Sequence, residues 1–112
     1  MAGERMRRVN EAIRQVLADA LAGELADPRL GFVTVTDVKT SPDLRNARVY
    51  VSVLGDEEAR TGSLAALASA HGLLQGRIAA QLSLKRTPRL EFVYDTTTDR
   101  ALRVESLLRE QG

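Results

Sequence analysis

One stretch of the sequence decides the fold: residues 63–94, which read SLAALASAHGLLQGRIAAQLSLKRTPRLEFVY. Its apolar side chains recur every three or four residues, the spacing of a helix with one buried side; they are Leu64, Leu67, Leu74, Ile78 and Leu82, with His71 on the same stripe. Gly72 and Gly76 fall within this pattern, and each weakens a helix interior by about 1 kcal/mol relative to Ala. We therefore predict two helices that share one core, with a bend between them. Periodicity alone also allows one straight helix.

The sequence before this stretch predicts a helix and a hairpin. Residues 4–26 have an amphipathic helical pattern that ends at Asp27-Pro28, because a residue before proline avoids the helical region. Residues 30–40 are rich in β-branched and aromatic side chains and carry apolar residues on both faces, which predicts a central strand. Residues 45–54 alternate strictly, as in a strand with one buried face. Residues 41–44, Ser-Pro-Asp-Leu, favour a turn between antiparallel strands.

The elements after the hairpin complete an α+β domain. Two helices lie between the strand at 45–54 and a third strand at 90–94, so a right-handed crossover should make these two strands parallel. A short final helix is expected from the apolar residues Ala101, Leu102, Val104, Leu107 and Leu108. We predict a three-stranded mixed sheet packed by helices, in the order helix, strand, strand, helix, helix, strand, helix.

Length and composition limit the class of protein. The chain has 112 residues, enough for one domain over 1–112, with short flexible ends expected at 1–4 and 110–112. It has no cysteine, hence neither a disulfide nor a thiolate metal site. The first residues lack the apolar segment of a signal peptide, and no run of about 18 apolar residues could span a membrane. We expect a soluble, cytoplasmic monomer without a cofactor or metal.

The sequence offers little for catalysis. The one histidine, His71, lies on the apolar stripe, where packing is the simpler interpretation. Hydroxyl and carboxyl groups that could form an acid–base or metal site have no spacing that brings them together; they are Ser41, Asp43, Ser83, Asp37, Asp95 and Asp99. No phosphate-binding glycine loop and no dinucleotide fingerprint occurs. We therefore predict that the protein is not an enzyme.

Basic residues give the sharper signal, although 16 basic residues are balanced by 15 acidic ones. Arg77, Lys85, Arg86 and Arg89 follow one another with no acidic residue until Glu91, which predicts contact with RNA phosphates. Cations at the end of a helix are also favoured by its dipole, so this run has a structural explanation too. Arg5, Arg7, Arg8 and Arg14 make the start of the first helix basic, and an ordinary solvated helix face explains them as well as phosphate contact does. The predicted site includes Arg7 and Arg8, and it extends to Lys39, Arg45 and Arg48 on the hairpin. The four aromatic residues lie in strands, where core packing is expected, and this argues against base stacking.

The predicted order of elements is that of a type II KH domain, a module that clamps the nucleic-acid backbone with a Gly-x-x-Gly loop. Here Ala70-His71-Gly72 stands in place of that loop. With this Ala-x-Gly sequence, the chain resembles the bacterial ribosome-binding factor A family over nearly its whole length, and the resemblance implies a helix kink at Ala70, His71 and Gly72 in place of the loop. Three further stretches carry the resemblance: VTVTDV at 33–38, SPDL at 41–44 with ARVYVS at 47–52, and RTPRLEFVYD at 86–95.

The resemblance implies a non-catalytic assembly factor. Such a protein binds the free small (30S) ribosomal subunit, assists late maturation of 16S rRNA including its 5′ region, and supports growth in the cold. An assembly GTPase is a possible release partner. Two alternatives remain from the residues themselves: a generic RNA-binding KH-like module, which the missing Gly-x-x-Gly loop disfavours, and a protein–protein adaptor that would not depend on the basic loop.

Overall fold

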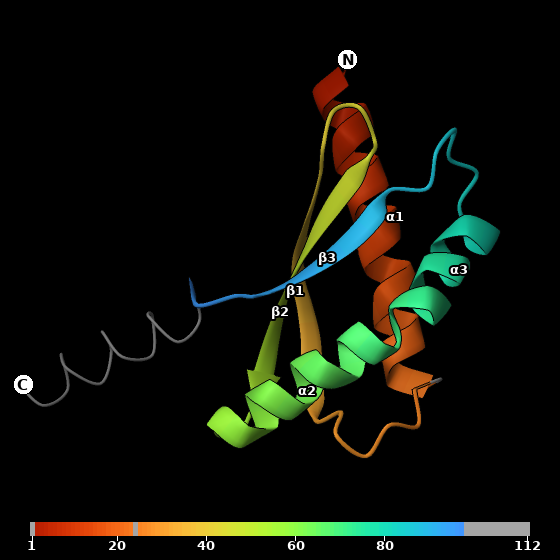
Figure 1. Cartoon of the computed structure of the whole chain (residues 1–112). Helices are drawn as coiled ribbons and strands as arrows, with labels where there is room; N and C mark the ends of the chain where they lie inside the picture. Colours follow the sequence, from red (N-terminus) through yellow and green to blue (C-terminus); the bar gives the residue numbers. More distant parts are fainter. Residues whose placement is uncertain (1, 24, 98–112) are drawn as a thin grey trace, which may run out of the picture.

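The computed structural model describes residues 2–23 and 25–97, which form three helices and three strands (Figure 1). In chain order they are α1 (Ala2–Gly23), β1 (Phe32–Thr40), β2 (Asn46–Leu54), α2 (Glu57–Ser69), α3 (His71–Gln81) and β3 (Arg89–Tyr94). The predicted order from the first helix to the third strand is confirmed, with boundaries that differ by a few residues. The final helix expected around residues 101–108 lies outside the described residues.

The strands form one mixed sheet in the order β1-β2-β3. β1 and β2 are antiparallel, and β2 and β3 are parallel, as the hairpin and the crossover predict. The prediction that residues 30–40 form the central strand is wrong, because β2 is central and β1 lies at an edge. A register shift between Val35 and Asp37 explains the error. The extra residue there turns Val35 and Val38 to the same buried face, although their spacing in the sequence suggests opposite faces.

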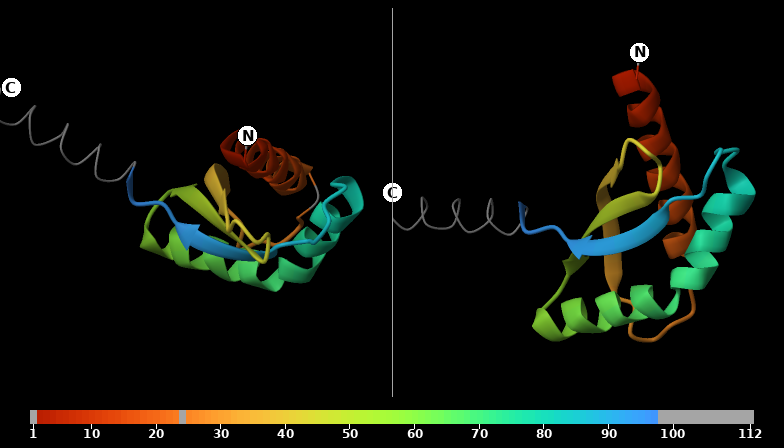
Figure 2. Two further views of the ribbon diagram at one scale, coloured as in Figure 1. Left: turned by 90° about the horizontal axis from the view of Figure 1, so that it is seen from above. Right: turned by 45° about the horizontal axis from the view of Figure 1, so that its top comes forward.

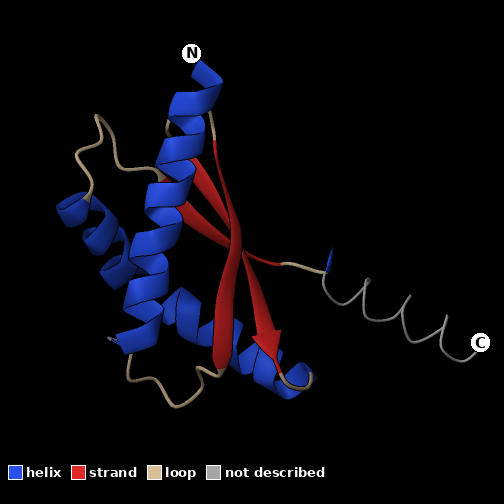
Figure 3. Ribbon diagram, turned by 180° about the vertical axis from the view of Figure 1, so that it is seen from behind, coloured by secondary structure: helices blue, strands red, loops and turns tan. Residues whose placement is uncertain are grey.

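The helices cover one face of this sheet. Along β2 the alternate residues Ala47, Val49, Val51 and Val53 are buried, while the residues between them are more exposed. They join one core with side chains from all three helices; these include Ile13 and Leu17 of α1, Leu67 of α2, and Leu74 and Ile78 of α3. Figures 2 and 3 show α1 lying on the β1 side of the domain, and α2 and α3 passing along β2 and β3. The opposite face of the sheet carries no described helix.

Helices α2 and α3 meet at Ala70, which lies outside both helices with φ −86° and ψ 4° (Figure 1). The Ala70 N–H donates to Ala66 O, and Ala70 O accepts from the Leu74 N–H, both at 3.0 Å. The chain therefore changes direction while its backbone stays hydrogen-bonded on either side. At the other end of α2, the Asp56 carboxylate accepts from the Ala59 N–H at 2.9 Å and caps the helix.

Two side chains of α3 hold the free edge of β3. His71 Nε2 donates to Leu90 O at 3.0 Å, and Gln75 Nε2 donates to Pro88 O at 3.0 Å. Gln75 Oε1 accepts from the Leu90 N–H at 2.6 Å. Because β3 pairs only with β2, these outward backbone groups have no strand partner among the described residues. The polar side chains at the start of α3 thus complete the hydrogen bonding of β3.

Candidate RNA-binding surface

Three segments distant in the sequence meet at one end of the molecule (Figures 1 and 2). They are the beginning of α1, the loop between β1 and β2, and the loop between α3 and β3. Between them lies a groove of about 720 Å³, lined by Arg5, Met6, Val9, Pro42, Leu44, Ser83, Leu84 and Lys85. The Arg89 N–H donates to Arg45 O at 2.8 Å, which ties the two loops together. We call this region the basic end and define it by Arg5, Arg45, Lys85, Arg86 and Arg89.

The β1–β2 loop is built on short-range hydrogen bonds. Ser41 Oγ donates to the Asp43 carboxylate at 2.7 Å and accepts from the Asn46 N–H at 3.0 Å. Asp43 also accepts from the Arg45 N–H at 3.1 Å. The Ser41 hydroxyl, followed by this N–H, holds the pKa of Asp43 below its usual value. Ser41 and Asp43, which the sequence analysis considered as acid–base or metal-site candidates, therefore shape the loop and leave Arg45 exposed to solvent.

The structure places most of the predicted basic residues at or beside the basic end. Lys85, Arg86 and Arg89 are exposed in the α3–β3 loop and at the start of β3, and Arg45 is exposed beside them. Lys39 and Arg48 are directly opposite each other on β1 and β2. They share a tyrosine: Lys39 Nζ lies 5.7 Å from the centre of the Tyr50 ring, and a hydrogen bond with Tyr50 raises the pKa of Arg48.

The remaining predicted cations have other surroundings. Arg7 and Arg8 project from the beginning of α1, and both are ion-paired with Glu4, at 3.5 and 3.6 Å. These pairs are exposed, so they are weak and can exchange for phosphate. Arg77 is half-buried in the middle of α3. Of the predicted cations, Arg45, Lys85, Arg86 and Arg89 thus belong to the basic end, whereas Arg7 and Arg8 line a different groove.

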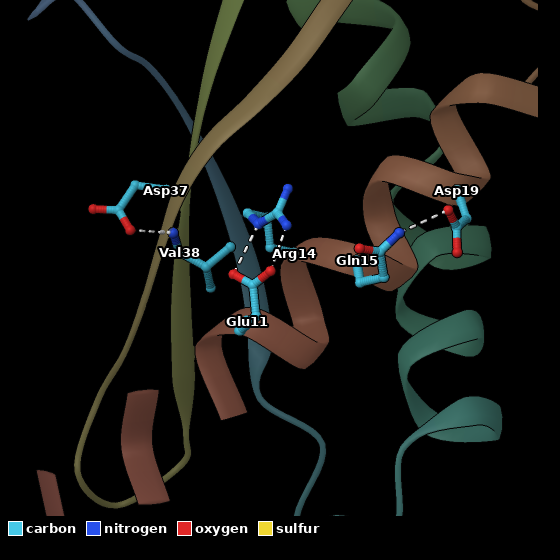
Figure 4. Close-up of polar contacts among 6 residues, drawn as sticks. All are labelled: Glu11, Arg14, Gln15, Asp19, Asp37 and Val38. Atoms are coloured by element: carbon cyan, nitrogen blue, oxygen red, sulfur yellow. Dashed lines mark hydrogen bonds and ion pairs between the residues drawn. The ribbon is translucent and has the colours of Figure 1, made fainter. Parts of the chain in front are cut away.

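A second groove, of about 430 Å³, runs between α1 and the edge of β1 and is lined by Arg7, Arg8, Asn10, Glu11, Arg14, Asp37 and Val38. Figure 4 shows its polar contacts: Arg14 is paired with Glu11, which lowers the pKa of Glu11, and the Asp37 carboxylate accepts from the Val38 N–H at 2.9 Å. Asn10 Oδ1 accepts from the Thr40 N–H at 2.9 Å. Asp37, another predicted acidic candidate, thus satisfies the backbone at the β1 bulge.

The predicted kink residues differ in their surroundings. Ala70 and His71 are half-buried, and His71 is bonded to β3 as described above. Gly72 is exposed, and so is Gly76; a side-chain carbon added at either position would meet nothing within 4 Å. The expectation that the two glycines belong to the buried stripe is therefore wrong. Within the described part of the chain, neither glycine is needed for close packing of α3 against the sheet.

Sequence reasoning missed two features. The four aromatic residues were expected in the core, but Phe32 is 78% exposed. Its position at the start of an edge strand, on the face opposite Val33, is the signal that could have revealed this. Arg5 was not included in the predicted site, although it lines the groove with Lys85. The basic start of the first helix was recognised in the sequence, but of its arginines only Arg5 lines this groove, while Arg7, Arg8 and Arg14 line another.

No helix among residues 2–23 and 25–97 has the length and apolar character needed to cross a membrane. In the same residues, no three histidine, cysteine, aspartate or glutamate side chains gather in a way that could hold a metal ion.

Comparison with known proteins identifies the family. Residues 5–108 match the family model described as ribosome-binding factor A. The chain is 47% identical over 110 residues to ribosome-binding factor A of Heliobacterium modesticaldum, covering 98% of this chain and 91% of that protein. It is 45% identical over 106 residues to the Saccharopolyspora erythraea protein of the same name, covering 95% and 64% respectively.

Solved structures agree with this assignment. The crystal structure of Thermus thermophilus ribosome-binding factor A matches with a TM-score of 0.70 and 34% identity, over 80% of this chain and 94% of that chain. A homology model of the Thermus thermophilus factor, fitted into a cryo-EM map of a 30S–RbfA complex, matches with a TM-score of 0.65 and 34% identity, over 79% and 92%. The chain therefore belongs to the ribosome-binding factor A family.

Proposed function

We propose that this protein binds the free small (30S) ribosomal subunit and, without catalysing a reaction, assists late maturation of 16S rRNA, including its 5′ region. The observation that carries the proposal is the basic end, where Arg5 and Lys85 line one groove and Arg45, Arg86 and Arg89 are exposed on the adjoining loops, Arg45 in an exposed ion pair with Asp43 at 3.7 Å. Membership of the ribosome-binding factor A family suggests that the basic end binds the ribosome, since a homology model of the Thermus thermophilus relative has been fitted into a map of a 30S complex. Single-domain organisation over 1–112, a monomeric state, a cytoplasmic location and release by an assembly GTPase belong to the same proposal.

The basic end would act on the RNA backbone. Arg45, Lys85, Arg86 and Arg89 are exposed and can neutralise phosphates, and their binding would release counterions. Lys39 and Arg48 would extend these phosphate contacts onto the open face of the sheet, and Arg7 and Arg8 would extend them along α1. Contacts of this kind fix position and orientation without reading bases, so the shape of the folded rRNA would select the binding site.

The kink and the final helix complete the proposal. Ala70-His71-Gly72 would replace the Gly-x-x-Gly loop of other KH domains, with the exposed Gly72 allowing an RNA backbone to approach α3 closely. Support comes from the open space around Gly72 and from the helix junction at Ala70. A helix after residue 97 is supported by Asp95, whose carboxylate accepts from the Thr97 N–H at 2.9 Å, the contact of a helix N-cap.

Co-sedimentation with purified small subunits, large subunits and whole ribosomes across a salt series tests the proposal. We expect selective binding to free small subunits that weakens steeply with salt. Reversing charge in the double variant Arg86→Glu/Arg89→Glu should weaken binding and lower the slope of log K against log salt, by about one for each lost phosphate contact. Arg29→Gln is the control, since Arg29 lies beside Ser69 at the end of α2, away from the basic end.

The outcomes separate the proposal from its alternatives. Equal binding to all three particles would indicate a generic RNA-binding module. Selective binding with an unchanged affinity and salt slope in the double variant would indicate a protein–protein adaptor. The absence of binding to small subunits would refute the proposed function.

A further inference from the structure

The most exposed large apolar side chains of the described chain form a pair. Phe32 and Leu54 are 78% and 77% exposed, and the β1–β2 register places them directly opposite each other. Directly paired side chains lie on the same face of a sheet, within contact distance. The next pair, Val33 and Val53, faces the core, so Phe32 and Leu54 point to the face without described helices. We call these two residues the apolar pair.

The apolar pair lies far from the basic end. Leu54 is the last residue of β2, whereas Arg45 precedes its first residue, Asn46. The length of the strand separates them by about 26 Å, at ~3.3 Å per residue. The third exposed apolar residue, Leu73 on α3, is 45% exposed and belongs to another part of the surface. The apolar pair is thus a separate surface feature, which the proposed phosphate contacts leave uncovered.

Acidic residues follow the apolar pair closely in the chain, and the one cation that lines a groove with Phe32, Arg14, is already paired with Glu11. After Leu54 the chain turns at Gly55, and Asp56, Glu57 and Glu58 begin α2. Asp56 is engaged as the cap of that helix. Glu57 and Glu58 are exposed and make no ion pair with any described residue. Carboxylates repel phosphates and attract cationic side chains, so these two glutamates disfavour RNA and favour a basic partner.

We infer that the apolar pair and the neighbouring glutamates bind a basic protein segment on the small subunit, one that places an apolar side chain on Phe32 and Leu54 and lysines or arginines beside Glu57 and Glu58. Exposed aromatic side chains are frequent anchors of protein interfaces, and opposite charge at the rim steers and orients the partner. The inference rests on the proposed function, because it seeks the partner on the small subunit. The protein would then touch the subunit with two ends of unlike chemistry.

Substitutions test how much the apolar pair and the two glutamates contribute to binding of the small subunit. The double variant Phe32→Ser/Leu54→Ser should weaken small-subunit binding by about tenfold, the effect of losing an interface anchor. The salt slope should stay unchanged, since no phosphate contact is lost. Glu57→Gln/Glu58→Gln should weaken binding by less, about threefold, as expected for rim charges. Leu73→Ser is the matched control for lost apolar surface and should bind normally. All five positions are exposed, so the apolar-pair variant and Leu73→Ser should keep the thermal midpoint of the unchanged protein. Glu57→Gln/Glu58→Gln should lower it slightly, because acidic residues in the first turn stabilise a helix.

Photo-crosslinking identifies the partner. Phe32 is replaced by p-benzoyl-phenylalanine, the protein is bound to purified small subunits, and the crosslinked species is identified by mass spectrometry. A crosslink to a lysine- or arginine-rich segment of a small-subunit protein would support the inference. A crosslink to 16S rRNA, to a second copy of the chain or to its own residues 98–112 would overturn it, as would co-sedimentation without any crosslink. If the unchanged protein does not bind small subunits, the proposed function and this inference fail together.

Discussion

Gln75 should contribute more to stability than its half-buried position suggests. Its side-chain amide donates to Pro88 O and accepts from the Leu90 N–H, and Leu90 is only 3% exposed. Each hydrogen bond contributes about 0.5–1.5 kcal/mol net, and a buried N–H left without a partner costs about 1–3 kcal/mol. We therefore expect Gln75→Ala to lower the free energy of unfolding by about 2–3 kcal/mol.

Thermal and urea denaturation measure this effect. For a domain of this size about 1 kcal/mol corresponds to about 4 °C, so the midpoint should fall by about 8–12 °C. Gln81→Ala is the matched control, because Gln81 is exposed at the end of the same helix and should change the midpoint by at most about 2 °C. Hydrogen exchange of the Leu90 amide should accelerate only in the Gln75 variant. Equal midpoints for the two variants would refute the contribution assigned to Gln75.

A pH series sharpens the same experiment. In Gln75→Glu one carboxylate oxygen would keep the bond from the Leu90 N–H, which favours the charged form, and the other would face Pro88 O, an acceptor. Because the repulsion by Pro88 O and the half-buried position together oppose the charge, we expect the folded pKa to lie above the unfolded value of about 4.3. A raised folded pKa means that stability is retained below the unfolded pKa and is lost as the pH rises through the folded one. The variant should approach the unchanged protein at acid pH, where its neutral carboxyl group can donate to Pro88 O, and fall behind it near neutrality. A deficit independent of pH would contradict this geometry.

Three further predictions concern single positions. The Arg29 guanidinium and then the Arg29 N–H lower the pKa of Asp27 to about 2. The contribution of Asp27 to stability is therefore complete above the unfolded pKa of 3.8 and is lost as the pH falls to about 2. The urea midpoints of Asp27→Asn and the unchanged protein should differ near neutrality and converge toward pH 2. Gly55→Ala should destabilise by about 1–3 kcal/mol, because φ is +130° and the new carbon would lie 2.9 Å from Ala59 Cβ. Gly76→Ala, in open space on α3, should stabilise by about 0.5–1 kcal/mol; thermal melts in which both variants shift alike would contradict this pair.

The sequence was sufficient for the order of elements because its patterns are local. The alternation of Ala47, Val49, Val51 and Val53 and the stripe through Leu67, Leu74 and Ile78 both reach the core as predicted. The position of β1 was misjudged because a bulge changes which face a residue occupies. A period of two cannot show where an extra residue interrupts the strand, so Val38 seemed to oppose Val35.

The candidate site was predictable only as a list of residues. Arg45 and Arg89 lie far apart in the sequence, and their proximity depends on the parallel pairing of β2 and β3. The bonds of His71 and Gln75 to β3 were not foreseen, because a polar residue on an apolar stripe does not reveal which backbone group it meets. Phe32 was misplaced for a related reason. Its residue type favours burial, but its end position and its face leave nothing to bury it.

The pairing of β2 with β3 also sets an order of events during folding. The β1–β2 hairpin closes over a short loop and can form once residue 54 has emerged from the ribosome. β3 can pair with β2 only after α2, α3 and their loops have been made. The entropic cost of closing this long crossover therefore falls late in folding. A nascent chain that has not yet reached Arg89 therefore carries β2 with one unpaired edge. The last strand to emerge is the one that closes the sheet and removes an edge open to other chains.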